Sequence, residues 1–281
     1  MSVDLSVLFW ILKYLALIAM KYIFTIKAKI YFTFAKNDCM TKIIAISNFK
    51  GGVGKTTSTM NIGASLAQTG KRVLLVDLDP QFNLTRCLGV QSPQNIYGAL
   101  FNQYSTPIVH RLKNLDLLPS DLELIRAETE LVSQYRREEK LNSILKDNLA
   151  NYDYILIDCP PSLGVLSQMA FYSADIILVP IQAEFLALTG YSVLVRALDA
   201  IGIEIDGAFV TQYDKRQVLD RNMFESMQNI IGEKLFKTVI RQNVALAEST
   251  IQGKTIFEYS PLSNGATDYK NLSSEILSKF N

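Results

Sequence analysis

One glycine-rich segment limits the folds open to this chain more than any other part of its 281 residues. It reads K-G-G-V-G-K-T-T over residues 50–57, between the apolar, β-branched run Lys42–Ser47 and the helical pattern Thr56–Thr69. Glycines let the backbone turn with its N–H groups facing inward, and the following helix contributes the positive end of its dipole. This order of strand, turn and helix predicts a site for a phosphate anion.

The rest of the chain alternates strand and helix patterns. Apolar runs predict further strands at Arg72–Asp77, Tyr154–Asp158, Ile176–Ile181, Gly207–Thr211 and Leu235–Ile240. Apolar residues spaced by three and four predict helices at Leu122–Leu149, Ser162–Tyr172, Thr189–Ile201, Leu219–Ile231 and Thr267–Phe280. Continuous apolar strands separated by helices are typical of parallel sheets buried on both faces. We expect an α/β fold with a mostly parallel, doubly wound sheet and helices on both faces.

The first 39 residues do not fit this pattern. They contain 27 apolar residues and five Lys against two Asp, whereas the remainder carries 23 basic and 25 acidic residues. Lys13 interrupts the apolar stretch Val7–Met20, so neither uncharged piece approaches the ~18–20 residues that span a bilayer. Three interpretations stay open: a wrongly chosen upstream start codon, an apolar extension, or a weak membrane anchor. We expect residues 40–281 to form one domain, because no repeat, low-complexity tract or Pro/Gly-rich linker divides them.

Composition excludes several functional classes. The formal net charge is +1, so no field over the whole chain points to an acidic partner. Cys39, Cys87 and Cys159 have no zinc or disulfide spacing, and they fit a reducing compartment such as the cytoplasm. The single histidine, His110, lies in a predicted polar connection, so we set aside histidine triads and histidine-rich metal sites.

The two lysines of the glycine-rich segment have different expected tasks. In a loop of this kind Lys55 reaches the β- and γ-phosphates of a nucleotide, and the Thr56 hydroxyl binds Mg²⁺. Lys50 is a second ammonium group five residues earlier, and the strict P-loop pattern would place a glycine at Phe49. The expected nucleotide-binding residues are Lys50, Gly51, Gly52, Val53, Gly54, Lys55, Thr56 and Thr57.

Two further predicted strands end in carboxylates. Asp77 and Asp79 lie two residues apart, so they share one face of an extended backbone, and Pro80 stops the strand there. Asp158 stands at the carboxyl end of another strand. In a parallel sheet such ends face the ligand, so we expect Asp158 to hold Mg²⁺ through water.

These motifs resemble those of the ParA/Soj partition ATPases, which have the deviant Walker A loop of the ParA/MinD class. The loop at residues 50–57 is similar to theirs, as are V-D-L-D-P-Q at Val76–Gln81 and I-D-C-P-P-S at Ile157–Ser162. Asp79 follows Lys50 by 29 residues, the spacing that the family leads us to expect. A similar C-terminal pattern, S-x-G-A-x-x-Y-x-x-L, extends the resemblance from about residue 40 to the end.

The resemblance implies roles for particular residues. Lys50 would reach across a dimer interface to the nucleotide of the partner subunit, and with Lys55 and Asp79 it would act in catalysis. Asp79 would orient or activate the attacking water. Asp77 would lie near the metal, together with Thr56 and Asp158. The family also implies ATP and Mg²⁺ as cofactors, a homodimer with ATP, nonspecific DNA binding, and a ParB-like partner that accelerates hydrolysis.

The candidates for DNA contacts lie after the strand that ends at Thr211. Asp214-Lys215-Arg216 resembles the D-x-R of the family, which carries a DNA-contacting arginine. Further on the family often reads I-P-R-N-V-R-L-x-E, whereas residues 240–248 of this chain read I-R-Q-N-V-A-L-A-E. The first arginine is displaced to Arg241 and the second is Ala245, so Lys215, Arg216 and Arg241 are the expected contacts.

The sequence therefore predicts a cytoplasmic, slowly hydrolysing ATPase that acts as a dimerising switch in chromosome or plasmid partitioning. One alternative is a MinD-like spatial regulator at the membrane. Residues 271–281 carry only Lys279 and Glu275, unlike the basic tail of such regulators, and a membrane role would need residues 1–39 as an anchor. The other alternative is a P-loop enzyme of metabolism or electron transfer, although Cys87 and Cys159 do not match iron–sulfur positions.

Overall fold

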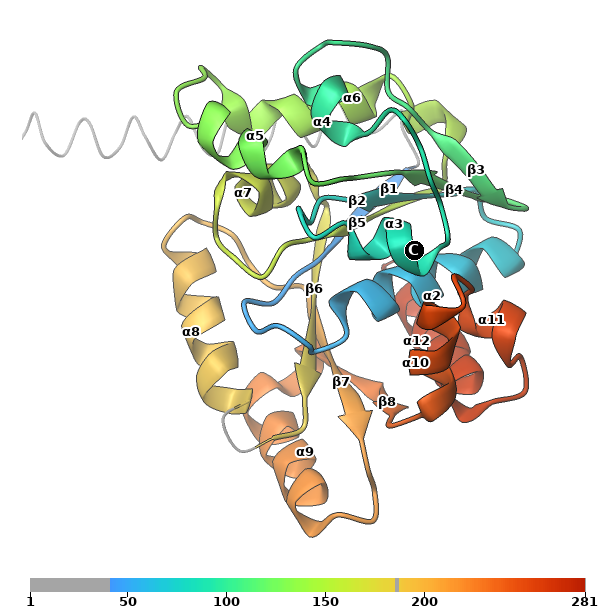
Figure 1. Cartoon of the computed structure of the whole chain (residues 1–281). Helices are drawn as coiled ribbons and strands as arrows, with labels where there is room; N and C mark the ends of the chain where they lie inside the picture. The colour runs from blue at the N-terminus through green and yellow to red at the C-terminus, as the bar shows by residue number, and fades with distance from the viewer. Residues whose placement is uncertain (1–40, 185–186, 281) are drawn as a thin grey trace, which may run out of the picture. The chain divides into compact units, whose positions relative to one another are not determined.

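The computed structural model describes residues 41–184 and 187–280 of the chain. In this part of the chain, eight strands form one sheet (Figure 1). The strands are β1 (Lys42–Ile46), β2 (Val73–Asp77), β3 (Val109–Leu112), β4 (Leu115–Leu118), β5 (Tyr154–Asp158), β6 (Ile176–Gln182), β7 (Gly207–Tyr213) and β8 (Leu235–Arg241). Their order is β3-β4-β2-β5-β1-β6-β7-β8, and every neighbouring pair is parallel except β3 and β4. The interpretations of residues 1–39 lie outside the described residues.

Helices cover both faces of this sheet, as Figure 1 shows. One face packs against α4 (Ile96–Leu100), α5 (Leu124–Glu130), α6 (Lys140–Lys146), α7 (Val165–Ser173), α8 (Ala187–Asp199) and α9 (Val218–Ile231). The other packs against α2 (Lys55–Gln68), α3 (Asn83–Cys87), α10 (Val244–Ile251), α11 (Ile256–Tyr259) and α12 (Asn264–Phe280). The expected mostly parallel, doubly wound α/β fold is confirmed.

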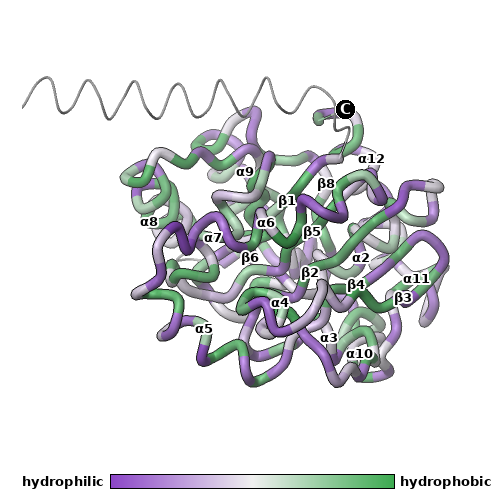
Figure 2. The backbone as a smooth tube through the Cα atoms, turned by 90° about the horizontal axis from the view of Figure 1, so that it is seen from above, coloured by the Kyte–Doolittle hydropathy of each residue, from purple (hydrophilic) through white to green (hydrophobic). Residues whose placement is uncertain are grey.

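Strand alternation explains why one short apolar run supplies both layers. In β1 the buried Ile43 and Ala45 belong to one core cluster, and Ile44 and Ile46 belong to the other. Successive side chains of a strand point to opposite faces, so a strand covered by helices on both sides needs apolar residues throughout. The hydrophobic colour of the central strands in Figure 2 follows this rule. Across the described part of the chain, none of the helices has both the length and the apolar character needed to cross a bilayer.

The predicted long helix over Leu122–Leu149 is wrong. The segment folds as α5, a 3₁₀ turn at Arg137–Glu139, then α6 and a second 3₁₀ turn at Leu149–Asn151. Arg136 has φ of 54°, a left-handed backbone that no α-helix can contain. The apolar spacing was read correctly, because Leu131, Leu141 and Leu145 are fully buried, but periodicity does not reveal where a helix breaks.

The assignment of His110 to a polar connection is also wrong, because it lies in β3. Strands β3 and β4 form an antiparallel hairpin, and Asn114 takes a left-handed φ of 64° in its turn. His110 Nδ1 and Asp116 Oδ1 face each other across the hairpin at 2.8 Å. A four-residue strand with two polar members gives little apolar signal, although Asn at such a turn is a familiar marker.

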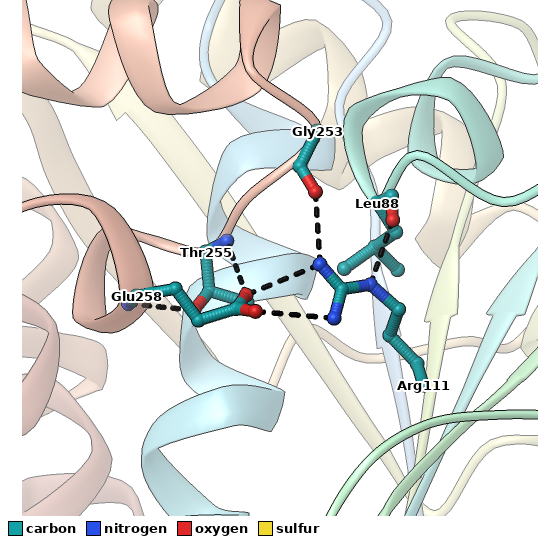
Figure 3. A network of polar contacts seen from close by, with 5 residues as sticks. All are labelled: Leu88, Arg111, Gly253, Thr255 and Glu258. Atoms are coloured by element: carbon teal, nitrogen blue, oxygen red, sulfur yellow. Dashed lines mark hydrogen bonds and ion pairs between the residues drawn. The ribbon is translucent and has the colours of Figure 1, made fainter.

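Arg111, also in β3, joins two segments that are far apart in the sequence (Figure 3). Its guanidinium donates from Nε to the Leu88 carbonyl after α3 at 2.7 Å and from Nη2 to the Gly253 carbonyl at 2.9 Å. It also pairs from Nη1 with Oε1 of Glu258 in α11 at 3.1 Å. Glu258 is held in turn by the Thr255 backbone N–H at 2.9 Å. The side chain thus fastens the C-terminal helices to the hairpin and to α3.

Replacing Arg111 with methionine is expected to lower the free energy of unfolding by about 2–4 kcal/mol. The Arg111 side chain is only 17% exposed, so two carbonyls and a carboxylate would lose a donor that water replaces poorly. Urea denaturation measures the change. The control is Arg72→Met, because the Arg72–Asp153 pair spans 3.7 Å with Arg72 53% exposed, and about 0.5 kcal/mol or less is expected. If both variants lost the same free energy of unfolding, burial of the Arg111 side chain would not be the reason for its larger expected effect.

The edge strand β8 is closed by carboxylates of α12. Glu275 accepts the backbone N–H groups of Lys237 at 2.7 Å and of Thr238 at 3.0 Å. Asp268 accepts the N–H of Arg241 at 3.0 Å. These bonds satisfy donors that the end of a sheet would otherwise present to solvent.

Candidate nucleotide site

The carboxyl ends of β1, β2 and β5 lie side by side and carry the three predicted motifs. In the sheet register Asp158 is opposite Asp77 on one side and opposite Ile46 on the other. Ile46 leads directly into the glycine-rich loop. Ligands of parallel sheets bind outside the carboxyl ends of the strands. The fold therefore brings the loop and both aspartate motifs to one edge.

The loop has the backbone of an anion site. Gly52 and Gly54 have φ of 76° and 86°, which side-chain-bearing residues rarely adopt. α2 begins at Lys55 with Gly54 as its N-cap, and no side chain among the described residues caps its first N–H groups. Its first turn contains no acidic residue. These N–H groups and the dipole of a 14-residue helix favour a phosphate at this point.

Lys55 lies inside the loop. Its Nζ donates to the Lys50 carbonyl at 3.0 Å, so the side chain folds back over the turn. Burial lowers the pKa of its ammonium, and the negative charges of Asp158 and Asp79 oppose this shift. A cation held in a partly desolvated loop beside two carboxylates can neutralise the charge of a phosphate.

Thr56 and Asp158 form the most direct link between the loop and β5. The Thr56 hydroxyl donates to Asp158 Oδ2 at 2.7 Å, while Asp158 Oδ1 is buried without a hydrogen-bond partner among the described residues. Burial, followed by the charge of Asp77, raises the pKa of Asp158 well above its usual range. A buried, unpaired carboxylate oxygen beside a hydroxyl fits a hard cation that takes oxygen ligands.

The carboxylate of Asp77 is hydrogen-bonded to Thr85 of α3. Its Oδ2 accepts the backbone N–H of Thr85 at 2.8 Å and the Thr85 hydroxyl at 2.7 Å. Its Oδ1 accepts the Asp79 N–H at 3.3 Å. Burial raises the pKa of Asp77 to about 7, against the effect of these bonds. Within the described residues no group of three or more His, Cys, Asp or Glu side chains surrounds a common metal position.

Asp79 is buried at the same edge, after the end of β2. Its Oδ1 accepts the Gln81 N–H at 2.9 Å, which forms a tight turn around Pro80. Burial raises its pKa, while the Gln81 N–H and the charge of Lys55 act in the opposite direction. Asp79 is thus a buried carboxylate at the sheet edge that carries the loop.

Lys50 points away from its own loop. Its ammonium pairs with Glu184, after β6, and lies 3.4 Å from Gln182 Oε1. The Lys50 side chain is 45% exposed and that of Glu184 is 35% exposed. Thus Lys55 lies in the turn and Lys50 lies outside it, although the two are five residues apart.

The three DNA candidates lie at the carboxyl ends of two neighbouring strands. Lys215 and Arg216 follow β7, and Arg241 ends β8 in register with Tyr213 of β7. Lys215 is exposed. Arg216 is bound to Asp214 at 2.7 Å and Arg241 to Asp268 at 2.6 Å. These ion pairs partly neutralise the charges of Arg216 and Arg241. The sequence alone did not indicate this neutralisation.

Four residues near the loop were missed from the sequence. Asn48 donates from Nδ2 to the Pro180 carbonyl at 2.7 Å and accepts the Lys50 N–H on Oδ1 at 3.1 Å, so it anchors the start of the turn. Thr85 holds Asp77, as described above. Thr211 and Gln212 of β7 bind loop carbonyls. The bonds of Asn48 to Pro180, of Thr211 to Val53 and of Gln212 to Gly52 join residues more than 130 positions apart, so the sequence gives no direct signal for them.

Similarity to known proteins agrees with this geometry. A family model for an AAA domain matches residues 41–210. The sporulation initiation inhibitor protein Soj of Bacillus subtilis (strain 168) is 41% identical over 249 residues, which cover 84% of this chain and 98% of that protein. The chromosome-partitioning ATPase Soj of Thermus thermophilus is 40% identical over 84% of this chain and 95% of its own length.

Two solved structures have the same fold and were determined with a nucleotide and magnesium. Cobyrinic acid a,c-diamide synthase from Mycobacterium smegmatis, with bound ADP and magnesium, has a TM-score of 0.74 and 31% identity over 84% of this chain and 94% of its own. The septum site-determining protein MinD from Pyrococcus horikoshii, complexed with Mg-ADP, has a TM-score of 0.72 and 30% identity over 84% and 96%. The predicted P-loop type of the sheet is confirmed. The Soj relatives are matched over nearly their whole length, and this chain brings its loop and aspartate motifs to one sheet edge. The chain therefore belongs to the ParA/Soj family of chromosome-partitioning ATPases.

Proposed function

We propose that this chain is a cytoplasmic switch that dimerises with ATP and Mg²⁺, binds DNA nonspecifically in that state, and is released by slow, partner-stimulated hydrolysis. The observation that carries the proposal is the separation of the two lysines. Lys55 occupies the inside of the loop, whereas Lys50 leaves it and pairs with Glu184. A second ammonium outside its own loop can serve the nucleotide of another subunit.

The Lys50–Glu184 pair does not prevent this role. Both side chains are more than a third exposed, and a pair of this kind contributes only about 0–1 kcal/mol. A triphosphate brought up by a second subunit offers more negative charge and several acceptor oxygens. We therefore expect Lys50 to leave Glu184 when the ATP dimer forms.

Within one subunit the proposed tasks follow the geometry. The backbone of residues 51–57 and the Lys55 ammonium hold the phosphates. Thr56 and Asp158 would hold Mg²⁺, whereas the carboxylate of Asp77 is bound to Thr85. Bound Mg²⁺ would neutralise charge on the phosphates. Asp79 orients the attacking water, and a ParB-like partner completes the stabilisation of charge around the phosphates.

Sedimentation with DNA tests the switch. The protein is incubated with ATP, ADP or no nucleotide at 50 mM and 200 mM salt, and the bound fraction is measured. We expect binding only with ATP. If Lys215, Arg216 and Arg241 of both subunits each neutralise one phosphate, affinity falls about 10³-fold between these salt concentrations. Binding without ATP, or none at low salt, would contradict the proposal.

Matched variants identify the surface. Lys215→Ala with Arg216→Ala should weaken DNA binding and leave ATP hydrolysis without DNA unchanged. Lys71→Ala, at the opposite end of the sheet before β2, serves as the control. Because Arg216 and Arg241 already pair with acidic residues, Lys215 alone should account for a large part of the effect.

The similarity to MinD makes a membrane-associated regulator the second candidate. The described part of α12 does not favour a membrane-binding tail, since Ala266, Tyr269, Leu272 and Ile276 are buried in the core. Sedimentation with anionic vesicles, for the whole chain and for a chain lacking residues 1–39, separates the two functions. ATP-dependent vesicle binding without DNA binding would favour the MinD-like one. A substrate-dependent burst of ADP would instead favour a metabolic enzyme.

A further inference from the structure

The end of β7 reaches the phosphate-binding loop although β6 lies between β7 and β1 in the sheet. The Thr211 hydroxyl donates to the Val53 carbonyl at 2.8 Å, and Gln212 Nε2 donates to the Gly52 carbonyl at 2.6 Å. Thr211 is 2% exposed and Val53 is 1% exposed. Two consecutive loop carbonyls are therefore held from the same strand end.

The backbone at this strand end is unusual. Gln212 has φ of 54°, a left-handed conformation in the middle of Thr211–Tyr213. Glutamine has neither the freedom of glycine nor the short side chain that helps asparagine there. Such a conformation persists only where the surroundings hold it, and here the side-chain bond to Gly52 lies at the same residue.

The direction of these carbonyls matters for an anion site. A peptide unit is planar, so fixing the carbonyl of Gly52 fixes the N–H of Val53, and fixing that of Val53 fixes the N–H of Gly54. The glycines on either side of Val53 are free to rotate, and the loop alone does not determine which way these units face. Carbonyls held toward β7 keep the N–H groups directed away from it.

We propose that Thr211 and Gln212 are positioning residues that preorganise the phosphate-binding loop from β7. The inference rests on the proposed nucleotide-binding function of that loop. Preorganisation removes the cost of ordering the loop when the ligand binds, so its loss should appear in nucleotide affinity. The chemical step, which depends on Asp79 and the metal, should be affected much less.

Thr211 allows an isosteric test. Thr211→Val keeps the shape of the buried side chain and removes the hydroxyl, whereas Thr211→Ser keeps the hydroxyl. We expect the valine variant to bind a fluorescent ADP analogue about tenfold more weakly, the scale of one buried hydrogen bond, and the serine variant to recover most of the affinity. Equal affinity of the valine variant and the unchanged protein would overturn the assignment of Thr211.

Gln212 separates positioning from simple structural support. Gln212→Gly relieves the left-handed backbone, so the melting temperature should stay or rise, yet nucleotide affinity should fall about 3- to 10-fold. Gln212→Met, of similar length without a donor, should lose a similar factor. A purely structural role would move stability and affinity together.

Steady-state hydrolysis completes the test. The variants should raise KM and leave kcat within about twofold, because the lost contacts act on binding. If the unchanged protein binds no nucleotide, the proposed function fails. If it binds while the valine, glycine and methionine variants bind equally well, only the positioning role fails.

Discussion

Replacing Lys55 with alanine is expected to weaken the binding of ATP and ADP about 100-fold or more, which corresponds to about 2.8 kcal/mol. Lys55 is only 7% exposed, and its Nζ lies over the turn on the Lys50 carbonyl. Asp158 and Asp79 oppose the lowering of its pKa by burial. Without the lysine, the phosphates would meet these carboxylates without the ammonium group that lies inside the loop. Titration with a fluorescent ADP analogue measures the loss.

The control for this prediction is Lys71→Ala. Lys71 precedes β2 and therefore lies at the amino end of the sheet, opposite the site. The Lys71→Ala variant should bind nucleotide with the same affinity as the unchanged protein. Urea denaturation should show that both the Lys55→Ala and the Lys71→Ala variants are folded. A folded Lys55→Ala protein with unchanged affinity would remove Lys55 from the site.

Replacing Asp79 with alanine is expected to leave ATP bound and to reduce its hydrolysis by about 10²- to 10⁴-fold, the usual contribution of a positioned acid or base. The ATP dimer should then accumulate, because the step that dissolves it is blocked. Phosphate release gives the rate, and size-exclusion chromatography with ATP gives the oligomeric state. Hydrolysis at the normal rate would show that Asp79 has another role.

Asp77 provides the contrast, two residues away. Asp77→Ala leaves the Thr85 N–H and hydroxyl without their acceptor and frees the start of α3 from β2. We expect this variant to lose stability, by about 2–4 kcal/mol in urea denaturation, before any effect on the chemical step is seen. The two neighbouring aspartates would thus be distinguished: Asp79 would control the rate of hydrolysis, and Asp77 would control the stability of the fold.

The sequence predicted the buried strands and helices of the fold better than the points at which a helix or an apolar run is interrupted. Runs of β-branched residues located the six longer parallel strands, because a strand buried on both faces must be apolar throughout. The hairpin β3–β4 was missed, because His110 and Arg111 interrupt the apolar pattern, and Arg111 pairs with Glu258, which is far away in the sequence. The break at Arg136 was missed because it depends on a left-handed residue within a regular apolar spacing.

The candidate site was predictable where its residues are contiguous. The loop 50–57 and the strand-end aspartates follow from local order, and the structure places them at one edge. The bonds from Thr211, Gln212 and Glu184 were not predictable, because β6 and β7 meet the loop only after the sheet has formed. The commitment of Asp77 to Thr85 was hidden for a related reason, since a carboxylate at a strand end can bind a metal or a helix.

The closed edge at β8 bears on how large an assembly of this protein can grow. Fibres and strand-exchanged chains extend through the unpaired N–H and C=O groups of an edge strand. In the described part of the chain, Glu275 and Asp268 cover donors of β8, and the opposite edge strand β3 is four residues long, irregular in register and charged. Both edges of the described sheet therefore offer few free donors or regular positions for a further strand. Contacts between copies of this chain would therefore involve helix and loop surfaces and not a shared sheet.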